Sequence, residues 1–342
     1  MNGSEPSKFS QIHHIGVLGA GAWGTALAQV AAQAGCGVTL WALEPDAVIE
    51  INSSHTNALS ALPDQKLSSS IHATGAMADL AACDAILTVA PAQYARPTLK
   101  QLAPHLKAGA LIVLCAKGVE LKTNALMTEV LAAEAPDARG VVLSGPGFAR
   151  DVARGLPTAV TIASTDKDAA AAIVEAIGLP TFRPYLSDDP IGAQIGGAVK
   201  NVIAIACGVA EGRKLGEGAR AALITRGFAE MTRLGLARGG RLETLNGLAG
   251  LGDLVLTCVS HTSRNMSFGV EIGMGKSASE ALASRRSVVE GVASAPAVTA
   301  LARASGVDMP ICAAVDDLLA GRVDVEKAIL DLLSRPFRSE GV

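Results

Sequence analysis

Short apolar runs alternate with helical patterns over the first half of the chain. The apolar runs lie at residues 15–18, 38–41, 85–90, 111–116, 140–144 and 158–163. Continuous runs of this kind are typical of strands buried on both faces of a parallel sheet. Helical periodicity separates them at residues 23–34, 92–105, 125–135 and 167–178. The alternation predicts an α/β fold with a doubly wound parallel sheet, whose ligands collect at the carboxyl ends of the strands.

The strand patterns fade from about Asp189, and the rest of the chain is helical in character. Helical spacing of apolar residues recurs at 192–211, 220–238, 264–273, 277–284, 296–305, 313–320 and 324–333. Loop-forming residues gather at 184–190, which is where we expect the boundary. We therefore predict an α/β domain at residues 13–188 and an all-helical domain at residues 189–335.

Glycines spaced G-x-G-x-x-G follow the first predicted strand directly. They are Gly19, Gly21 and Gly24, with Ala22 and Trp23 between them, and a helical pattern begins at once. The spacing alone would fit an ordinary turn. A strand before it and a helix after it favour dinucleotide binding, because the glycines let the backbone approach a pyrophosphate at the helix N-terminus. The motif makes the first domain Rossmann-like.

The second predicted strand ends near Glu44, which is the candidate residue for the adenosine ribose. In such folds an acidic residue at this strand end accepts hydrogen bonds from the ribose hydroxyls, whereas a basic residue accommodates a 2′-phosphate. No Lys or Arg is adjacent to Glu44.

Composition and charge exclude several classes of protein. The 342 residues have a formal net charge of −3 and no long run of one sign, which argues against a nucleic-acid partner. The six cysteines show neither a C-x-x-C pair nor zinc spacing, so we expect a reducing compartment and assign no metal. Residues 1–12 lack the apolar core of a signal peptide, and apolar runs such as 202–206 are too short for a membrane span. These features predict a cytoplasmic protein without a membrane partner and leave its oligomeric state, a homodimer included, open.

Polar and glycine residues follow two of the later strands, where a ligand is expected. Lys117 comes directly after the run at 111–116, although a solvated loop lysine would look the same. Gly145 and Gly147 follow the run at 140–144. They either bring backbone N–H groups close to a ligand or simply make a turn.

Lys200 stands in a helix that is apolar on nearly every other face. Its ammonium either reaches solvent along the apolar stem or is held in a partly dry cleft. In a dry cleft the neutral amine is favoured, so that the lysine can exchange a proton with a substrate. Asp253 follows two glycines and either caps a helix or pairs with a buried cation such as Lys200.

Ser263, Arg264 and Asn265 offer a hydroxyl, a guanidinium and an amide within one turn. These groups suit a phosphate or a carboxylate. A plain helix start with a surface arginine is the alternative.

Together these segments resemble the bacterial NAD(P)-dependent glycerol-3-phosphate dehydrogenases. The similarity runs from about residue 15 to residue 333. The stretches that carry it are 19–26, 116–118, 144–146, 155–159, 196–201, 222–227, 247–253 and 289–291. The resemblance implies a Rossmann-like domain followed by a helical domain that binds the substrate. It implies NAD or NADP as cofactor and the reduction of dihydroxyacetone phosphate to sn-glycerol 3-phosphate for glycerophospholipid synthesis.

The resemblance also implies a role for each matching residue. Lys200 would exchange the proton at the C2 oxygen, with Asp253 positioning the substrate beside it. Lys117 would touch both cofactor and substrate. The residues implied at the phosphate are Ser263, Arg264 and Asn265. Gly145 and Gly147 are implied as further contacts to the substrate. The residues implied at the cofactor, beyond the glycine turn, are Arg264, Ala149, Val288 and Glu290.

Two departures from the family pattern affect these expectations. Gly147 stands where the family usually has Thr, so a hydroxyl contact to the substrate is lost. Leu43 and Glu44 stand where the family often has Arg or His, which favours NAD over NADP. A related small hydroxy-acid or ketopantoate-type dehydrogenase is the near alternative. A catalytically inactive nucleotide-sensing protein is a more distant one, against which the presence of both Lys200 and Asp253 argues.

Overall fold

The computed structural model describes residues 11–58, 62, 65–285 and 287–336. Residues 1–10, most of the segment where we expect no signal peptide, lie outside this range. The chain divides into two compact units. Unit 1 comprises residues 1–90, 94–116 and 128–190, and unit 2 comprises residues 91–93, 117–127 and 191–342. Unit 2 therefore includes two short segments, residues 91–93 and 117–127, that lie in the chain between parts of unit 1.

Unit 1 is built on one sheet with the strand order β3-β2-β1-β4-β5-β6-β7-β8. The strands are β1 (His14–Leu18), β2 (Gly37–Trp41), β3 (Ile71–Thr74), β4 (Ala85–Thr88), β5 (Leu111–Leu114), β6 (Arg139–Ser144), β7 (Thr158–Ala163) and β8 (Phe182–Ser187). Strands β1 to β6 run parallel, with Ile15 beside Val38 and Ala85. The order reverses at β1, which places a ligand crevice at the carboxyl ends of β1 and β4.

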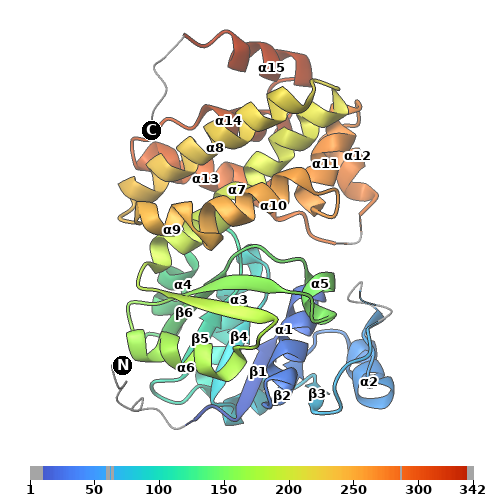
Figure 1. Ribbon diagram of the computed structural model, residues 1–342, viewed down its shortest axis with the longest axis vertical. Coiled ribbons are helices and arrows are strands. Elements are labelled where there is room, and N and C mark those ends of the chain that lie inside the picture. The colour runs from blue at the N-terminus through green and yellow to red at the C-terminus, as the bar shows by residue number, and fades with distance from the viewer. Residues whose placement is uncertain (1–10, 59–61, 63–64, 286, 337–342) are drawn as a thin grey trace. The chain divides into compact units, whose positions relative to one another are not determined.

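Helices cover both faces of the sheet (Figure 1). The helical segments that lie wholly or mainly in unit 1 are α1 (Ala22–Gln33), α2 (Pro45–Ser54), η2 (Met77–Ala82), α3 (Ala92–Leu102), η3 (Ala103–His105), α4 (Met127–Glu134), α5 (Ala149–Ala153) and α6 (Lys167–Ile177). Ile15 and Val17 pack in the core with α1, α5 and α6. Leu80 of η2 lies against Gly16 on the opposite face. The predicted doubly wound architecture is confirmed.

The sheet departs from the parallel arrangement at one edge. Strand β7 pairs antiparallel with β6, and β8 runs parallel to β7. An apolar run is equally compatible with both directions, so the sequence pattern could not tell them apart. Strands β3 and β8 were not predicted, because both are edge strands interrupted by polar residues or proline, such as His72 and Pro184.

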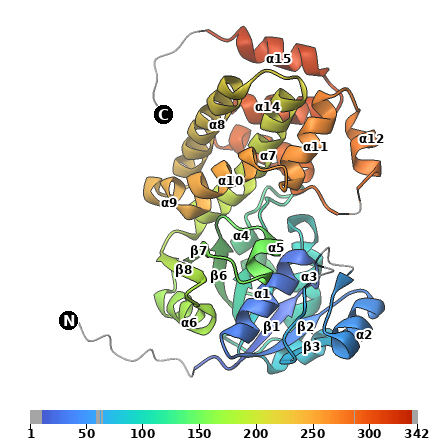
Figure 2. The same ribbon diagram turned by 45° about the vertical axis from the view of Figure 1, so that its right-hand side comes forward.

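Unit 2 is a bundle of helices around one long apolar helix. Its helices are α7 (Pro190–Gly212), α8 (Glu217–Ala237), α9 (Leu242–Asn246), η4 (Leu248–Gly252), α10 (Asp253–Val259), α11 (Arg264–Gly273), α12 (Ala278–Ala283), α13 (Glu290–Ala304), α14 (Pro310–Leu319) and α15 (Val325–Leu333). Figure 2 shows α7 among α8, α10 and α11. Helix α7 has the length and composition of a membrane span, but its apolar stretch is entirely buried inside the unit. It is therefore the core helix of the bundle.

Candidate functional site

The turn between β1 and α1 has the geometry that a pyrophosphate requires. Gly19 has φ +118°, a conformation that side chains rarely adopt. A methyl group on Gly24 would lie 1.8 Å from the carbonyl oxygen of Gly19, so only glycine fits there. A methyl group on Gly21 would meet no atom within 4 Å, which leaves the start of α1 open to a ligand. These residues fit a dinucleotide, because the first backbone N–H groups of α1 have no partner within the helix.

A buried asparagine that sequence analysis did not single out braces this turn. Asn57 Nδ2 donates to the carbonyl oxygen of Ala20 and to Thr25 Oγ1, both at 2.9 Å. Thr25 Oγ1 also donates to Ala20, at 3.2 Å. Asn57 is distant along the chain and follows no recognised motif. No signal in the sequence connected it with the glycine turn.

The other cofactor candidates of unit 1 lie after β2 and β6. Glu44 is exposed and precedes α2 directly, where its side chain makes no capping hydrogen bond. Ala149 begins α5, which packs beside α1. A methyl group on Gly147 would lie 3.4 Å from the ring of Trp23 and 3.2 Å from Cγ2 of Thr158. The Trp23 and Thr158 side chains would have to shift by a few tenths of an ångström to admit a larger residue at this position.

Unit 2 contains a buried cluster of two lysines and one aspartate. Asp253, the first residue of α10, is 1% exposed. Its Oδ1 accepts from Lys200 Nζ and its Oδ2 accepts from Lys117 Nζ, both at 2.7 Å. Lys200 Nζ also donates to Thr257 Oγ1 at 2.9 Å. The pairing of Asp253 with a buried cation, one of its two alternatives, is therefore what the structure shows, and Lys200 is itself buried.

Burial and neighbouring charges set the protonation of this cluster. Burial lowers the pKa of Lys200 to about 8. The Asp253 carboxylate opposes this effect, and the Lys117 ammonium adds to it. Burial raises the pKa of Asp253, but Lys117 and Lys200 outweigh burial and hold that pKa below its ordinary value. Near neutral pH the cluster therefore carries two positive charges and one negative charge, a net charge of +1.

Lys200 keeps one hydrogen-bonding position for a ligand. An ammonium group has three N–H donors. Within the part of the chain that the structure describes, Lys200 Nζ has two acceptors, Asp253 Oδ1 and Thr257 Oγ1. One N–H therefore remains for an oxygen outside the protein. The role of Thr257 was not predicted, although it lies one helical turn after Asp253.

A chain of amide hydrogen bonds joins this cluster to α11 and α13. Asn201 Nδ2 donates to the backbone carbonyl of Lys117 at 3.0 Å. Asn265 Nδ2 donates to Asn201 Oδ1, and the N–H of Gly291 donates to Asn265 Oδ1, both at 2.9 Å. The buried Asn265 side chain thus holds three segments together. Asn201 was not predicted as a site residue, although it directly follows Lys200.

Close packing of two helices brings α11 to the lysine helix. A methyl group on Gly208 of α7 would lie 2.1 Å from the carbonyl oxygen of Met266. A methyl group on Gly269 of α11 would lie 2.2 Å from the carbonyl oxygen of Ile205. The two backbones touch, so glycine is required on both sides. This contact fixes the position of the α11 N-terminus relative to Lys200.

The predicted phosphate residues lie at that N-terminus. Ser263 is buried and caps α11, its hydroxyl oxygen accepting from the N–H of Met266. The Arg264 side chain is exposed and, among the described residues, makes no ion pair. Glu290 begins α13, and burial raises its pKa to about 7. The Arg264 charge and a hydrogen bond from the Ala92 N–H group act in the opposite direction and lower that pKa. Val288 is exposed just before Glu290.

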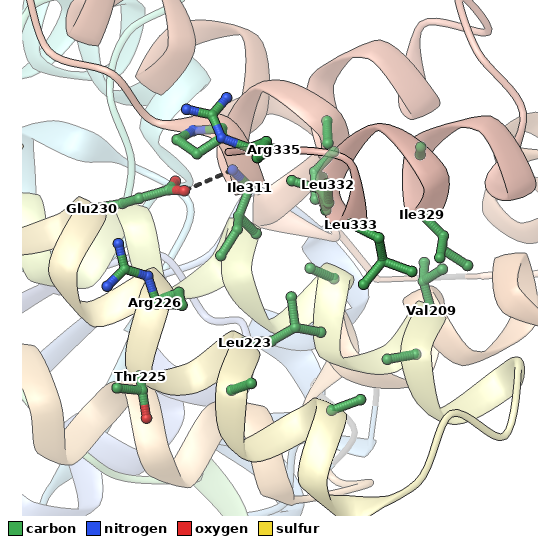
Figure 3. A pocket seen from close by; sticks show the side chains of 18 of the residues that line it. Val209, Leu223, Thr225, Arg226, Glu230, Ile311, Ile329, Leu332, Leu333 and Arg335 are labelled. Carbon is green, nitrogen blue, oxygen red and sulfur yellow. Dashed lines mark hydrogen bonds between the residues drawn. The ribbon is translucent and has the colours of Figure 1, made fainter. Parts of the chain in front are cut away.

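A separate cavity of about 830 Å³ lies elsewhere in unit 2 (Figure 3). Apolar side chains of α7, α8, α14 and α15 line most of it. Its wall includes the buried carboxylate of Glu230, which accepts the N–H groups of Ile311 and Cys312 at 2.7 and 3.1 Å. None of the predicted site residues lines this cavity.

Comparison with known proteins identifies the family. The model of the NAD-dependent glycerol-3-phosphate dehydrogenase N-terminus matches residues 14–170, and the model of the C-terminus matches residues 189–330. Glycerol-3-phosphate dehydrogenase (NAD(P)+) of Parvibaculum lavamentivorans is 60% identical over 326 residues, which cover 95% of this chain and 98% of that protein. The homologue from Caulobacter vibrioides is also 60% identical, over 95% of this chain and 98% of its own length.

Solved structures agree with this assignment. The crystal structure of glycerol-3-phosphate dehydrogenase from Coxiella burnetii superposes with a TM-score of 0.91 at 40% identity, covering 95% of this chain and 99% of that one. A ketopantoate reductase from Ralstonia eutropha has a TM-score of 0.59 at 17% identity, over 92% of this chain and 99% of that one, and shares the fold alone. The matches to both family models, together with the identity to full-length relatives, show that the chain belongs to the NAD-dependent glycerol-3-phosphate dehydrogenase family.

Proposed function

We propose that this chain reduces dihydroxyacetone phosphate to sn-glycerol 3-phosphate with NADH or NADPH, to supply glycerophospholipid synthesis in the cytoplasm. Its curated relatives carry the name of this activity. The observation that carries the proposal is the buried Lys200 ammonium, which has one uncommitted N–H beside Asp253. Six free cysteines are consistent with a reducing compartment.

Lys200 would hold and protonate the ketone oxygen. As the carbonyl carbon is reduced, negative charge develops on its oxygen, and the free N–H of Lys200 stabilises that charge. The ammonium then transfers its proton to the oxygen, which completes the hydroxyl group. A pKa of about 8 suits this task, because the lysine is charged near neutral pH and still gives up its proton readily.

Asp253 and Lys117 would prepare Lys200 for this step. The Asp253 carboxylate fixes the ammonium in one direction and favours its charged form. Lys117 donates to the second carboxylate oxygen, and both lysines hold the pKa of Asp253 below its ordinary value, so that Asp253 stays ionised and Lys200 is the group that gives the proton. The net charge of +1 in the cluster also attracts an anionic substrate.

The glycine turn after β1 would hold the pyrophosphate of the dinucleotide, and Glu44 would accept hydrogen bonds from its ribose hydroxyls. Ala22, Trp23, Lys117, Ala149, Arg264, Val288 and Glu290 complete the proposed cofactor residues. When bound, reduced nicotinamide supplies the hydride for the ketone carbon.

The exposed Arg264 guanidinium would bind the substrate phosphate, together with Ser263 and Asn265 at the start of α11. Arginine presents two parallel N–H groups to a phosphate, and a helix N-terminus favours an anion. The phosphate is remote from the reacting carbon, so its binding energy serves to orient the ketone. Gly145 and Gly147 are the proposed backbone contacts to the rest of the substrate.

The test is to replace Lys200 with alanine and to follow NADH oxidation with dihydroxyacetone phosphate as the acceptor. We expect kcat to fall by about 10²–10⁴-fold, the range typical of a lost general acid. Lys276→Met, at an exposed lysine of the same unit, should keep wild-type activity. Equal activity of wild type and Lys200→Ala would contradict the proposal. Faster turnover of ketopantoate than of dihydroxyacetone phosphate by the wild type would favour the alternative dehydrogenase class.

A further inference from the structure

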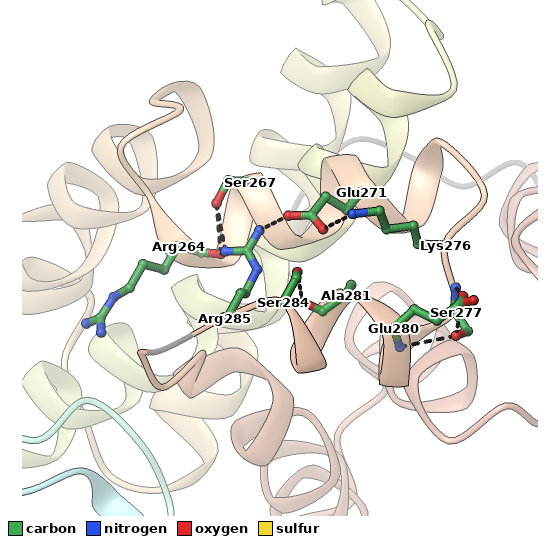
Figure 4. Close-up of polar contacts among 9 residues, drawn as sticks. All are labelled: Arg264, Ser267, Glu271, Lys276, Ser277, Glu280, Ala281, Ser284 and Arg285. Atoms are coloured by element: carbon green, nitrogen blue, oxygen red, sulfur yellow. Dashed lines mark hydrogen bonds and ion pairs between the residues drawn. The ribbon is translucent and has the colours of Figure 1, made fainter.

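Arg285 connects the first turn of α11 with the end of α12, just before the segment that leads into α13 (Figure 4). Its Nη1 donates to the backbone carbonyl of Arg264 at 3.2 Å and to Ser267 Oγ at 3.1 Å. Its Nη2 pairs with Glu271 Oε1 at 2.5 Å. One guanidinium therefore holds three points along α11.

These contacts differ from those of an ordinary surface arginine. The Arg285 side chain is only 15% exposed. Its guanidinium lies 5.6 Å from the ring centroid of Phe268, a residue that is completely buried. Stacking and several directed hydrogen bonds fix the plane of the guanidinium, which a single exposed ion pair does not do.

Arg285 fixes Arg264 at its backbone and leaves its side chain uncommitted. Figure 4 shows the Arg264 guanidinium pointing away from Arg285, at the far end of an extended side chain. Among the described residues, that guanidinium makes no ion pair, although it lies close enough to the partly buried Glu290 to lower the pKa of that carboxyl group. Glu271 is taken by Arg285 and Lys276. Glu271, the acid on the same helix as Arg264, is thus already occupied by two other cations.

We propose that Arg285 is a positioning residue for phosphate recognition. It holds the α11 N-terminus and keeps Glu271 away from Arg264, so that the Arg264 guanidinium remains available to the substrate phosphate. This inference rests on the proposed function, in which Arg264 binds that phosphate. In this proposal Arg285 acts through Arg264, since its terminal nitrogens donate to the Arg264 carbonyl, Ser267 Oγ and Glu271 Oε1.

The proposal separates two parts of the catalytic task. Loss of Arg285 should weaken interactions with the phosphate group and leave the Lys200 cluster intact, since no contact joins Arg285 to Lys117, Lys200 or Asp253 in the described chain. A substrate that lacks the phosphate should therefore be insensitive to the change. A merely structural role for Arg285 would affect both substrates equally.

The experiment compares Arg285→Met and Arg285→Lys with the wild type and with Lys276→Met. Lys276 pairs with the other oxygen of Glu271 at 2.9 Å, so its replacement removes a cation from the same carboxylate without touching the first turn of α11. Arg285→Lys keeps the charge beside Glu271 and protects the fold, but a single ammonium cannot also reach the Arg264 carbonyl. Arg264→Ala serves as the reference for a lost phosphate contact.

For each variant, kcat and KM are measured with dihydroxyacetone phosphate and with dihydroxyacetone, and the inhibition constant is measured for inorganic phosphate. We expect both Arg285 variants to lower kcat/KM for the phosphorylated ketone about tenfold, mainly through KM, and to weaken phosphate inhibition similarly. Dihydroxyacetone turnover and Lys276→Met should match the wild type. Equal losses on both ketones, or no loss on either, would overturn the proposal. If Arg264→Ala itself leaves the preference for the phosphorylated ketone unchanged, the proposed role of Arg264 fails instead.

Discussion

Opposite changes in the pH dependence of catalysis should follow from removing the two neighbours of Lys200. Asp253→Asn removes the carboxylate that favours the Lys200 ammonium. Lys117→Met removes the second cation, which disfavours it. Because reduction needs the ammonium form, the wild-type rate should fall as the pH rises through about 8. The midpoint of this fall should move down in Asp253→Asn and up in Lys117→Met.

The magnitude for Asp253→Asn follows from the contact that is lost. Lys200 Nζ and Asp253 Oδ1 are 2.7 Å apart, a charge-assisted hydrogen bond worth about 1.5–3 kcal/mol. One pKa unit corresponds to about 1.36 kcal/mol, so the midpoint should fall by about one to two pH units. The rise in Lys117→Met should be smaller, because the Asp253 carboxylate lies between the two ammonium groups and already screens them.

The assay is the pH profile of kcat/KM for dihydroxyacetone phosphate, which reports the pKa values of the free enzyme. Dividing each variant by the wild type at every pH removes the titration of the substrate phosphate. The reverse reaction provides the control, because oxidation of sn-glycerol 3-phosphate needs the neutral amine and its rate should rise over the same pH range. If the midpoint shifted in the same direction in the two variants, or did not shift in Asp253→Asn, the fall in rate at high pH could not be assigned to Lys200.

Three further predictions concern packing, buried charge and cofactor choice. Gly269→Ala should lower the free energy of unfolding by about 3 kcal/mol in urea titrations, because its methyl group would lie 2.2 Å from the Ile205 carbonyl oxygen, whereas Gly218→Ala meets nothing within 4 Å and should cost nothing. Burial raises the pKa of Glu230 from 4.5 to about 7 in the folded state, so native Glu230 binds more protons than the unfolded chain. Its contribution to the free energy of unfolding, at most about 3 kcal/mol, is therefore present below pH 4.5 and lost as the pH rises through 7. In urea titrations repeated over this pH range, Glu230→Gln should show a weaker dependence of the free energy of unfolding on pH. Steady-state constants should show NADH preferred over NADPH, and Glu44→Arg should reduce or reverse that preference; selectivity of the wild type for NADPH would contradict the role given to Glu44.

The sequence was sufficient to predict features that depend on residues close together in the chain. The glycine turn is such a case, since a strand, three spaced glycines and a helix all lie within a dozen or so residues. The strands β1, β2, β4 and β5 were likewise visible as continuous apolar runs. The direction of β7 and the edge strands β3 and β8 were not, because strand direction and edge pairing depend on partners distant in the sequence.

Some of the site residues could likewise be predicted from the sequence, and others could not. Lys200 and Asp253 were conspicuous because each is a charge in apolar surroundings. Asn57, Asn201 and Thr257 were not, because a small polar residue becomes informative only once its hydrogen-bond partner is known. Each of these three lies in a segment that folding brings beside a residue already identified, and Asn201 and Thr257 are close in sequence to Lys200 and Asp253.

The cost of the Lys117–Asp253–Lys200 cluster is itself an argument for its function. Two cations and one anion are removed from water, and replacing such a buried group by well-packed apolar residues is often neutral or stabilising. Within the cluster, two ammonium groups face one carboxylate, which leaves an excess of positive charge. Stability alone does not account for this arrangement, whereas an incoming phosphorylated ketone and the negative charge that develops on its oxygen would balance it. The same reasoning explains why Lys200→Ala should remain folded while losing activity, since Asp253 keeps Lys117 as its partner.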